Sequence, residues 1–131
     1  MNDGAREASP VKLLIVDDSS VVRRSIERQL KMPKISTILQ AGNGREAIEL
    51  FLEHRPDFVT MDITMPEMDG LTCVSKIMAI NPETRIMVIS ALGDAETAIE
   101  AVERGANEYV FKPFSEAELN QALRNLIEAP Q

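Results

Sequence analysis

The segment PDFVTMDITMPEMDG, residues 56–70, contains a short apolar run, Phe58 to Met61, that ends directly at an acid, Asp62. A proline precedes the run and a loop containing proline and glycine follows it, which is the pattern of a strand covered on both faces. An acid placed against a hydrophobic core loses solvation and is rarely retained without a partner, a metal or a function. Asp62 can also be explained as the cap of the helix or turn that follows, so this segment alone leaves both interpretations open.

Four other apolar runs are predicted to be strands, and helical patterns separate them. Together with 58–61, the strands are expected at residues 11–16, 35–39, 85–89 and 108–111. The helices are expected to start at caps or capping boxes formed by Ser19 or Ser20, Asn43 with Glu46, Asp69, Asp94, and Ser115 with Glu118. Residues 1–10 lack any period and are predicted to form a flexible tail, which leaves residues 11–128 as one domain.

Two of the helical patterns predict which side chains face the core. After Ser20, the residues predicted to be buried are Val22, Ile26 and Leu30, while Arg23, Arg24, Glu27 and Arg28 are predicted to face outward. After Asp94, the residues predicted to face inward are Ala95, Ala98, Ile99 and Val102, and Gly105 is expected to end that helix. Both helices are therefore predicted to be amphipathic and to cover a sheet.

The alternation of five strands with five helices predicts an α/β domain with a doubly wound parallel sheet, right-handed crossovers and helices on both faces. In such sheets the ligand site lies beyond the carboxyl ends of the strands. Four of the five predicted strands end there in polar residues, namely Asp17-Asp18, Asp62, Ser90 and Lys112. This edge is therefore the predicted functional site.

The residue types at this edge fit one kind of chemistry. Three converging carboxylates repel one another unless a cation lies among them, and oxygen ligands suit Mg²⁺. The ammonium of Lys112 and the hydroxyl of Ser90 can both bind phosphoryl oxygens. This set favours phosphoryl transfer to Asp62 as the nucleophile. Each residue also has an ordinary alternative: helix capping for Asp17 and Asp18, a solvated strand end for Lys112, and a local hydrogen bond for Ser90.

Composition excludes several other classes of function. The chain has 14 Lys and Arg against 21 Asp and Glu, a formal net charge of -7, and no basic stripe, so direct binding to nucleic acid or to an anionic membrane is not expected. The apolar runs are too short to span a membrane and no signal peptide pattern is present, so a cytoplasmic location is predicted. The single cysteine, Cys73, is expected to pack as a small apolar residue, and the single histidine, His54, to be exposed.

These motifs together resemble the receiver domain of two-component response regulators, most of all the single-domain chemotaxis type, over Val11 to Ile127. The matching features are the acidic pair Asp17-Asp18, the acceptor loop from Asp62 through Pro66 to Gly70, the hydroxyl-alanine pair Ser90-Ala91, the aromatic Tyr109, and Lys112-Pro113. The resemblance implies a flavodoxin-like sheet with strand order 2-1-3-4-5. It also implies that the Lys112-Pro113 bond is cis.

The resemblance further implies roles for individual residues. Asp18, Asp62 and the backbone carbonyl of Thr64 would ligate Mg²⁺, with Asp17 acting through water. Asp62 would accept a phosphoryl group from a histidine of a sensor kinase, or from another phosphodonor, and the domain would also catalyse its loss. Ser90 and Tyr109 would form a switch that alters a binding surface for a downstream protein within residues 94–128.

Two rival classes remain open. A phosphatase of the haloacid dehalogenase type also uses an aspartate nucleophile with Mg²⁺, but its motif needs a second acid two residues on, where this chain has Thr64. A receiver-like docking module without phosphorylation would keep the fold, but the intact acceptor, acidic pair and lysine argue against it. A nucleotide-binding domain is disfavoured because neither G-x-G-x-x-G nor a P-loop follows any predicted strand.

Overall fold

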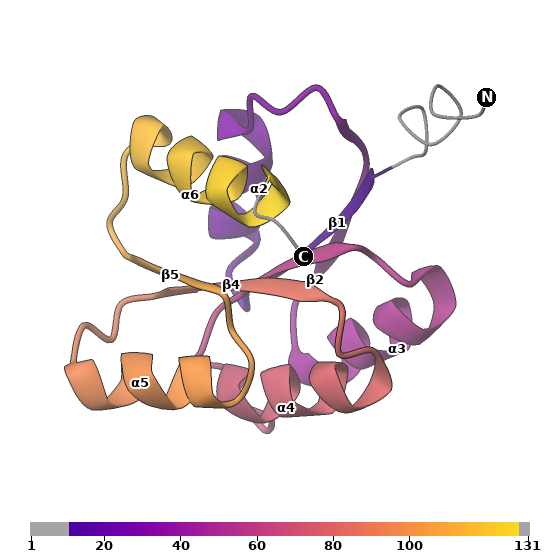
Figure 1. Ribbon diagram of the computed structural model, residues 1–131, viewed down its shortest axis with the longest axis vertical. Coiled ribbons are helices and arrows are strands. Elements are labelled where there is room, and N and C mark those ends of the chain that lie inside the picture. The colour runs from indigo at the N-terminus through magenta and orange to yellow at the C-terminus, as the bar shows by residue number, and fades with distance from the viewer. Residues whose placement is uncertain (1–10, 129–131) are drawn as a thin grey trace.

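The computed structural model describes residues 11–128, and Figure 1 shows a single sheet between two layers of helices. The predicted flexible tail, residues 1–10, lies outside the described residues. The strands are β1 (Val11–Val16), β2 (Ile35–Ala41), β3 (Phe58–Met61), β4 (Arg85–Ser90) and β5 (Glu108–Phe111). The helices are α2 (Ser20–Gln29), α3 (Gly44–His54), α4 (Gly70–Ile80), α5 (Ala95–Glu103) and α6 (Glu116–Glu128). All strand pairs are parallel and the order is β2-β1-β3-β4-β5, which confirms the predicted fold.

Two hydrophobic clusters hold the layers together, one on each face of the sheet. Helices α2 and α6 cover one face, and α3, α4 and α5 cover the other (Figure 1). Successive side chains of a strand point to opposite faces, so Leu13 and Ile15 join Ile26, Leu119 and Leu123, whereas Leu14 and Val16 join the second cluster. That cluster includes Phe51, Cys73, Val74 and Ile77, and Cys73 is fully buried, as predicted. Because both faces are covered, most residues of the central strands are apolar, and Thr60 and Ser90 are buried polar exceptions.

Most of the predicted helix starts are confirmed by their hydrogen bonds. Ser19, not Ser20, caps α2, and its Oγ accepts a hydrogen bond from the Val22 N–H. At the start of α6, Ser115 and Glu118 exchange side-chain hydrogen bonds with each other's backbone N–H groups in a full capping box.

Among the described helices, none combines the length and apolar character needed to cross a bilayer.

Two predictions about helix faces are wrong. Ile99 and Val102 of α5 are each 57% exposed, Ala95 is exposed as well, and the residue of this helix that enters the core is Ala101. Ala101 packs in the same hydrophobic cluster as Val74 and Ile77 of α4, and just beyond α5 the Arg104 guanidinium donates hydrogen bonds to the Leu71 carbonyl and to Ser75 Oγ of α4. The small side chain of Ala101 then faces inward and the larger apolar residues face solvent.

The second wrong prediction concerns Arg23, which was expected to face outward with Arg24. Its guanidinium instead turns toward the carboxyl edge of the sheet and donates a hydrogen bond to the backbone carbonyl of Asp17. A buried carbonyl that lacks a partner in the helix or the sheet requires a donor, and the arginine is long enough to supply one. This contact lies beside the predicted functional site.

Candidate functional site

The site is built at the carboxyl ends of β1 and β3, the two central strands. The Asp62 N–H donates to the Val16 carbonyl at 2.9 Å, which extends the ladder between the strands by one residue and holds the acid at the edge. After Asp62 the chain turns back so tightly that the Gly70 N–H reaches the Ile63 carbonyl at 2.8 Å. A Cβ at Gly70 would lie 2.0 Å from the Asp62 carbonyl oxygen, so only glycine fits this turn.

Three carboxylates meet at this edge, as the sequence predicted. One oxygen from each of Asp17, Asp18 and Asp62 lies within 4.8 Å of the others. Asp17 and Asp62 are buried, with 2% and 5% of their surface exposed, whereas Asp18 is exposed. Of the three acids, Asp18 is therefore the one that faces solvent.

Lys112 provides the positive charge in this cluster. Its Nζ lies 2.8 Å from Asp17 Oδ2 and 3.3 Å from Asp62 Oδ1, so one ammonium bridges both buried acids. Burial lowers the pKa of Lys112, but the two carboxylates outweigh that effect and the pKa is raised, so the side chain stays charged. The backbone N–H of Lys112 donates to the Ser90 carbonyl at 2.9 Å, and the Lys112-Pro113 bond is cis, as predicted.

One lysine does not neutralise three acids. The pKa of Asp62 is raised from 3.8 to about 6, first by burial and then by the charge of Asp17, with Lys112 only partly offsetting both. Oxygen-only ligands at this spacing, with an open side for water, fit Mg²⁺, which keeps several waters and prefers carboxylate ligands. Among the described residues, none donates a hydrogen bond to the Thr64 carbonyl, which leaves that oxygen available as a ligand.

Ser90 and Tyr109 meet on the backbone of one residue, Leu92. Ser90 is fully buried, and its Oγ accepts a hydrogen bond from the Leu92 N–H at 3.0 Å. The Tyr109 hydroxyl donates to the Leu92 carbonyl at 2.6 Å. The loop after β4 therefore contacts both residues of the predicted switch, while the switching itself stays a prediction.

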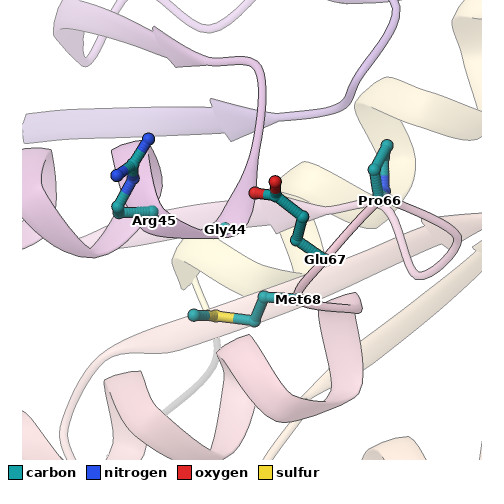
Figure 2. Close-up of a pocket in the computed structure, with 5 residues that line it drawn as sticks. All are labelled: Gly44, Arg45, Pro66, Glu67 and Met68. Atoms are coloured by element: carbon teal, nitrogen blue, oxygen red, sulfur yellow. The ribbon is translucent and has the colours of Figure 1, made fainter.

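A pocket of about 330 Å³ lies beside the acceptor loop, between that loop and the start of α3. Figure 2 shows the five residues that line it: Gly44, Arg45, Pro66, Glu67 and Met68. A Cβ at Gly44 would lie 2.8 Å from Met68 Sδ, so the absence of a side chain lets the loop pack closely against the helix. The loop carrying Asp62 is thus supported on this side as well.

The sequence analysis missed two residues that border the acidic cluster. Arg23 binds the Asp17 carbonyl, and Gln40 Oε1 accepts a hydrogen bond from Arg23 Nε at 3.1 Å. The spacing of Arg23 and Glu27 suggested only a solvated helix face. The only indication in the sequence was Gln40, a polar residue next to the end of the apolar strand β2, and such a residue alone is weak evidence for a contact with the site.

Comparison with known proteins agrees with this geometry. A family model described as the response regulator receiver domain matches residues 13–124, which include every residue of the site. The chain belongs to the response regulator receiver domain family. The chemotaxis protein CheY of Bacillus subtilis (strain 168) is 39% identical over 116 residues, which are 88% of this chain and 97% of that protein.

Two further matches, one a longer protein and one a solved structure, are also similar to this chain. The protein-glutamate methylesterase/protein-glutamine glutaminase 2 of Carboxydothermus hydrogenoformans is 51% identical over 108 residues, which are 80% of this chain but 30% of that longer protein. A chain in the crystal structure of the CheX-CheY-BeF3-Mg+2 complex from Borrelia burgdorferi superposes with a TM-score of 0.85 at 34% identity, covering 90% of each chain. The fold is therefore that of CheY-like receiver domains.

Proposed function

We propose that this receiver domain is a phosphoacceptor in two-component signalling and that Asp62 takes a phosphoryl group from a phosphohistidine of a sensor kinase. The observation that carries the proposal is the bridge from the Lys112 ammonium to Asp17 and Asp62 inside a group of three carboxylates. A lysine that contacts the nucleophile is placed to attract the incoming phosphoryl group and to balance its charge.

In the proposed reaction, an Asp62 carboxylate oxygen attacks phosphorus, the phosphorus–nitrogen bond to the donor imidazole breaks, and the leaving nitrogen keeps the electron pair. Lys112 stabilises the negative charge on the phosphoryl oxygens, and the Ser90 hydroxyl can donate to one of them. Asp18, Asp62 and the Thr64 carbonyl would hold Mg²⁺ directly, with Asp17 acting through a water. When bound, the ion supplies charge neutralisation at the carboxylates and at the phosphoryl oxygens.

The test of the acceptor uses acetyl phosphate and Mg²⁺ with detection by intact-protein mass. The wild type is expected to gain one phosphoryl group and Asp62→Asn to gain none. Asp94→Asn is the matched control, because Asp94 caps α5 away from the cluster and asparagine caps helices equally well. Equal phosphorylation of wild type and Asp62→Asn would reject the assignment. No addition to the wild type would favour the alternative of an unphosphorylated docking module.

We also propose that phosphorylation alters a protein-binding surface within residues 94–128, and that the pathway is chemotaxis or a related two-component system. The exposure of Ile99, Val102 and Phe111, each above half, supports a surface of this kind. Ser90 and Tyr109 connect it to the site through Leu92, so a movement of the Ser90 hydroxyl toward a phosphoryl oxygen would release one of the two bonds on that residue.

The switch is tested by amide NMR with beryllofluoride as the phosphoryl mimic. Shifts are expected to extend through residues 94–112 in the wild type and to shrink in Ser90→Ala, which lacks the hydroxyl. Shifts that stay at the loops around Asp18 and Asp62 in both proteins would contradict the switch. In a separate experiment, the kinase and the downstream target are sought by capture from a lysate with and without the mimic.

A further inference from the structure

Arg23 connects three elements next to the acidic cluster. Its Nη1 donates a hydrogen bond to the Asp17 carbonyl at 2.6 Å, and its Nε donates to Gln40 Oε1 of β2 at 3.1 Å. Gln40 is itself held, because its Nε2 donates to Glu27 Oε1 of α2 at 2.6 Å. The guanidinium is therefore anchored at two points, which a planar donor fork does better than a flexible ammonium.

The carbonyl that Arg23 binds belongs to the peptide unit between the two acids of the pair. Asp17 is 2% exposed, so its carbonyl lies where a donor is needed. The peptide unit is planar, so a fixed carbonyl also fixes the N–H and Cα of Asp18. Arg23 thus sets the orientation of the backbone from which both carboxylates project.

The two acids depend on this backbone to different degrees. The Asp17 carboxylate has donors of its own, the Ser19 N–H at 2.9 Å and Lys112 Nζ at 2.8 Å. The Asp18 carboxylate has no hydrogen bond or ion pair within residues 11–128. The peptide that Arg23 holds therefore fixes the point from which the Asp18 side chain projects.

The chain also leaves space for this guanidinium. Gly42 follows β2, and a Cβ at this position would lie 3.2 Å from Arg23 Nη1, closer than side chains usually approach. A larger residue at position 42 would press on the guanidinium. The glycine, the glutamine and the arginine therefore form one arrangement that ends at the Asp17 carbonyl.

We propose that Arg23 is a positioning residue of the Mg²⁺ site, which holds the Asp17-Asp18 peptide so that Asp18 is oriented toward the ion. This inference rests on the proposed function of the acidic cluster. A positioning role and a purely electrostatic role of Arg23 predict opposite changes in Mg²⁺ affinity. Removing a positive charge near a cation site should strengthen cation binding by simple electrostatics, whereas losing the support of the ligands should weaken it.

The test measures the Mg²⁺ dissociation constant of the folded, chelator-treated proteins by amide NMR titration. Arg23→Ala is expected to raise the dissociation constant about tenfold, the lower end of the range for a partner that orients a ligand. Gln40→Ala is expected to raise it by less, because Arg23 keeps its bond to Asp17. Arg24→Ala is the control, since Arg24 is an exposed neighbour of the same charge. It should leave the constant unchanged or lower it.

A second measurement separates positioning from a general loss of structure. The rate of phosphorylation by acetyl phosphate is measured against Mg²⁺ concentration. In Arg23→Ala the half-saturating Mg²⁺ concentration should rise, while the rate at saturating Mg²⁺ should stay near that of the wild type. A defect in the reacting groups themselves would lower the saturated rate instead.

The outcomes are distinct. Mg²⁺ binding by Arg23→Ala that is as tight as that of the wild type, or tighter, would overturn the positioning role and leave the proposed function intact. Absence of saturable shifts in the wild type would reject the proposed function and the positioning role with it. If Arg23→Ala does not fold, Gln40→Ala and Gly42→Ala decide, and wild-type affinity in both would overturn the role.

Discussion

The acidic cluster should make the metal-free protein less stable, and Asp62→Asn should relieve part of that. Asp62 is 5% exposed, and burial together with Asp17 raises its pKa from 3.8 to about 6. Each unit of difference between the folded and unfolded pKa corresponds to about 1.4 kcal/mol. The charge on Asp62 therefore lowers the free energy of unfolding by about 3 kcal/mol. Asparagine has nearly the same shape and carries no charge.

The raised pKa of Asp62 decides how the stability difference between the two proteins changes with pH. A carboxyl group with a higher pKa in the folded state stabilises the fold fully only below its unfolded pKa of 3.8, and this stabilisation is lost as the pH rises through about 6. The asparagine side chain does not titrate. The two proteins should therefore be similar in stability near pH 4, and Asp62→Asn should be more stable by about 2–3 kcal/mol near pH 8.

The assay is urea unfolding in the presence of a metal chelator at several pH values between these limits. Glu103→Gln serves as the control for loss of an exposed carboxylate outside the cluster. Mg²⁺ should narrow the difference at high pH, because a ligand that binds only the folded state stabilises the wild type. A difference that is constant with pH, or a variant less stable at high pH, would refute the electrostatic reasoning.

Three other substitutions test the packing and hydrogen bonding of the domain. Gly70→Ala should destabilise the domain by more than about 2 kcal/mol in urea unfolding, because its Cβ would lie 2.0 Å from the Asp62 carbonyl oxygen, whereas Gly93→Ala, with ordinary contacts, should change little. Asn120→Ala should cost about 2–3 kcal/mol in the same assay, since this buried side chain makes hydrogen bonds to three main-chain groups, and a wild-type melting curve would contradict that. Thr60→Val should raise stability by about 1 kcal/mol, because the buried Thr60 hydroxyl has no partner within residues 11–128, and any loss of stability would show that the hydroxyl is paired in solution.

Local chemistry in the sequence was sufficient for most of the fold. Apolar runs that stop at polar residues identified all five strands, and caps such as Ser19, Asp69 and Asp94 identified where helices begin. These signals are reliable because strand burial and helix capping depend on residues close together in the chain. Asp17, Asp18, Asp62 and Lys112 could also be grouped in advance, because the carboxyl ends of parallel strands meet at one edge.

The tertiary structure decided what depends on neighbours distant in the sequence. The apolar positions of α5 predicted an inward face with Ile99 and Val102, but packing against the rest of the domain brings Ala101 into the core and leaves Ile99 and Val102 in solvent. The pKa of Asp62 depends on burial and on the separation of charges from different strands. Arg23 was indistinguishable from its solvated neighbours in the sequence, because its role depends on a carbonyl at the end of β1 and a glutamine on β2, and periodicity within a helix carries no information about either.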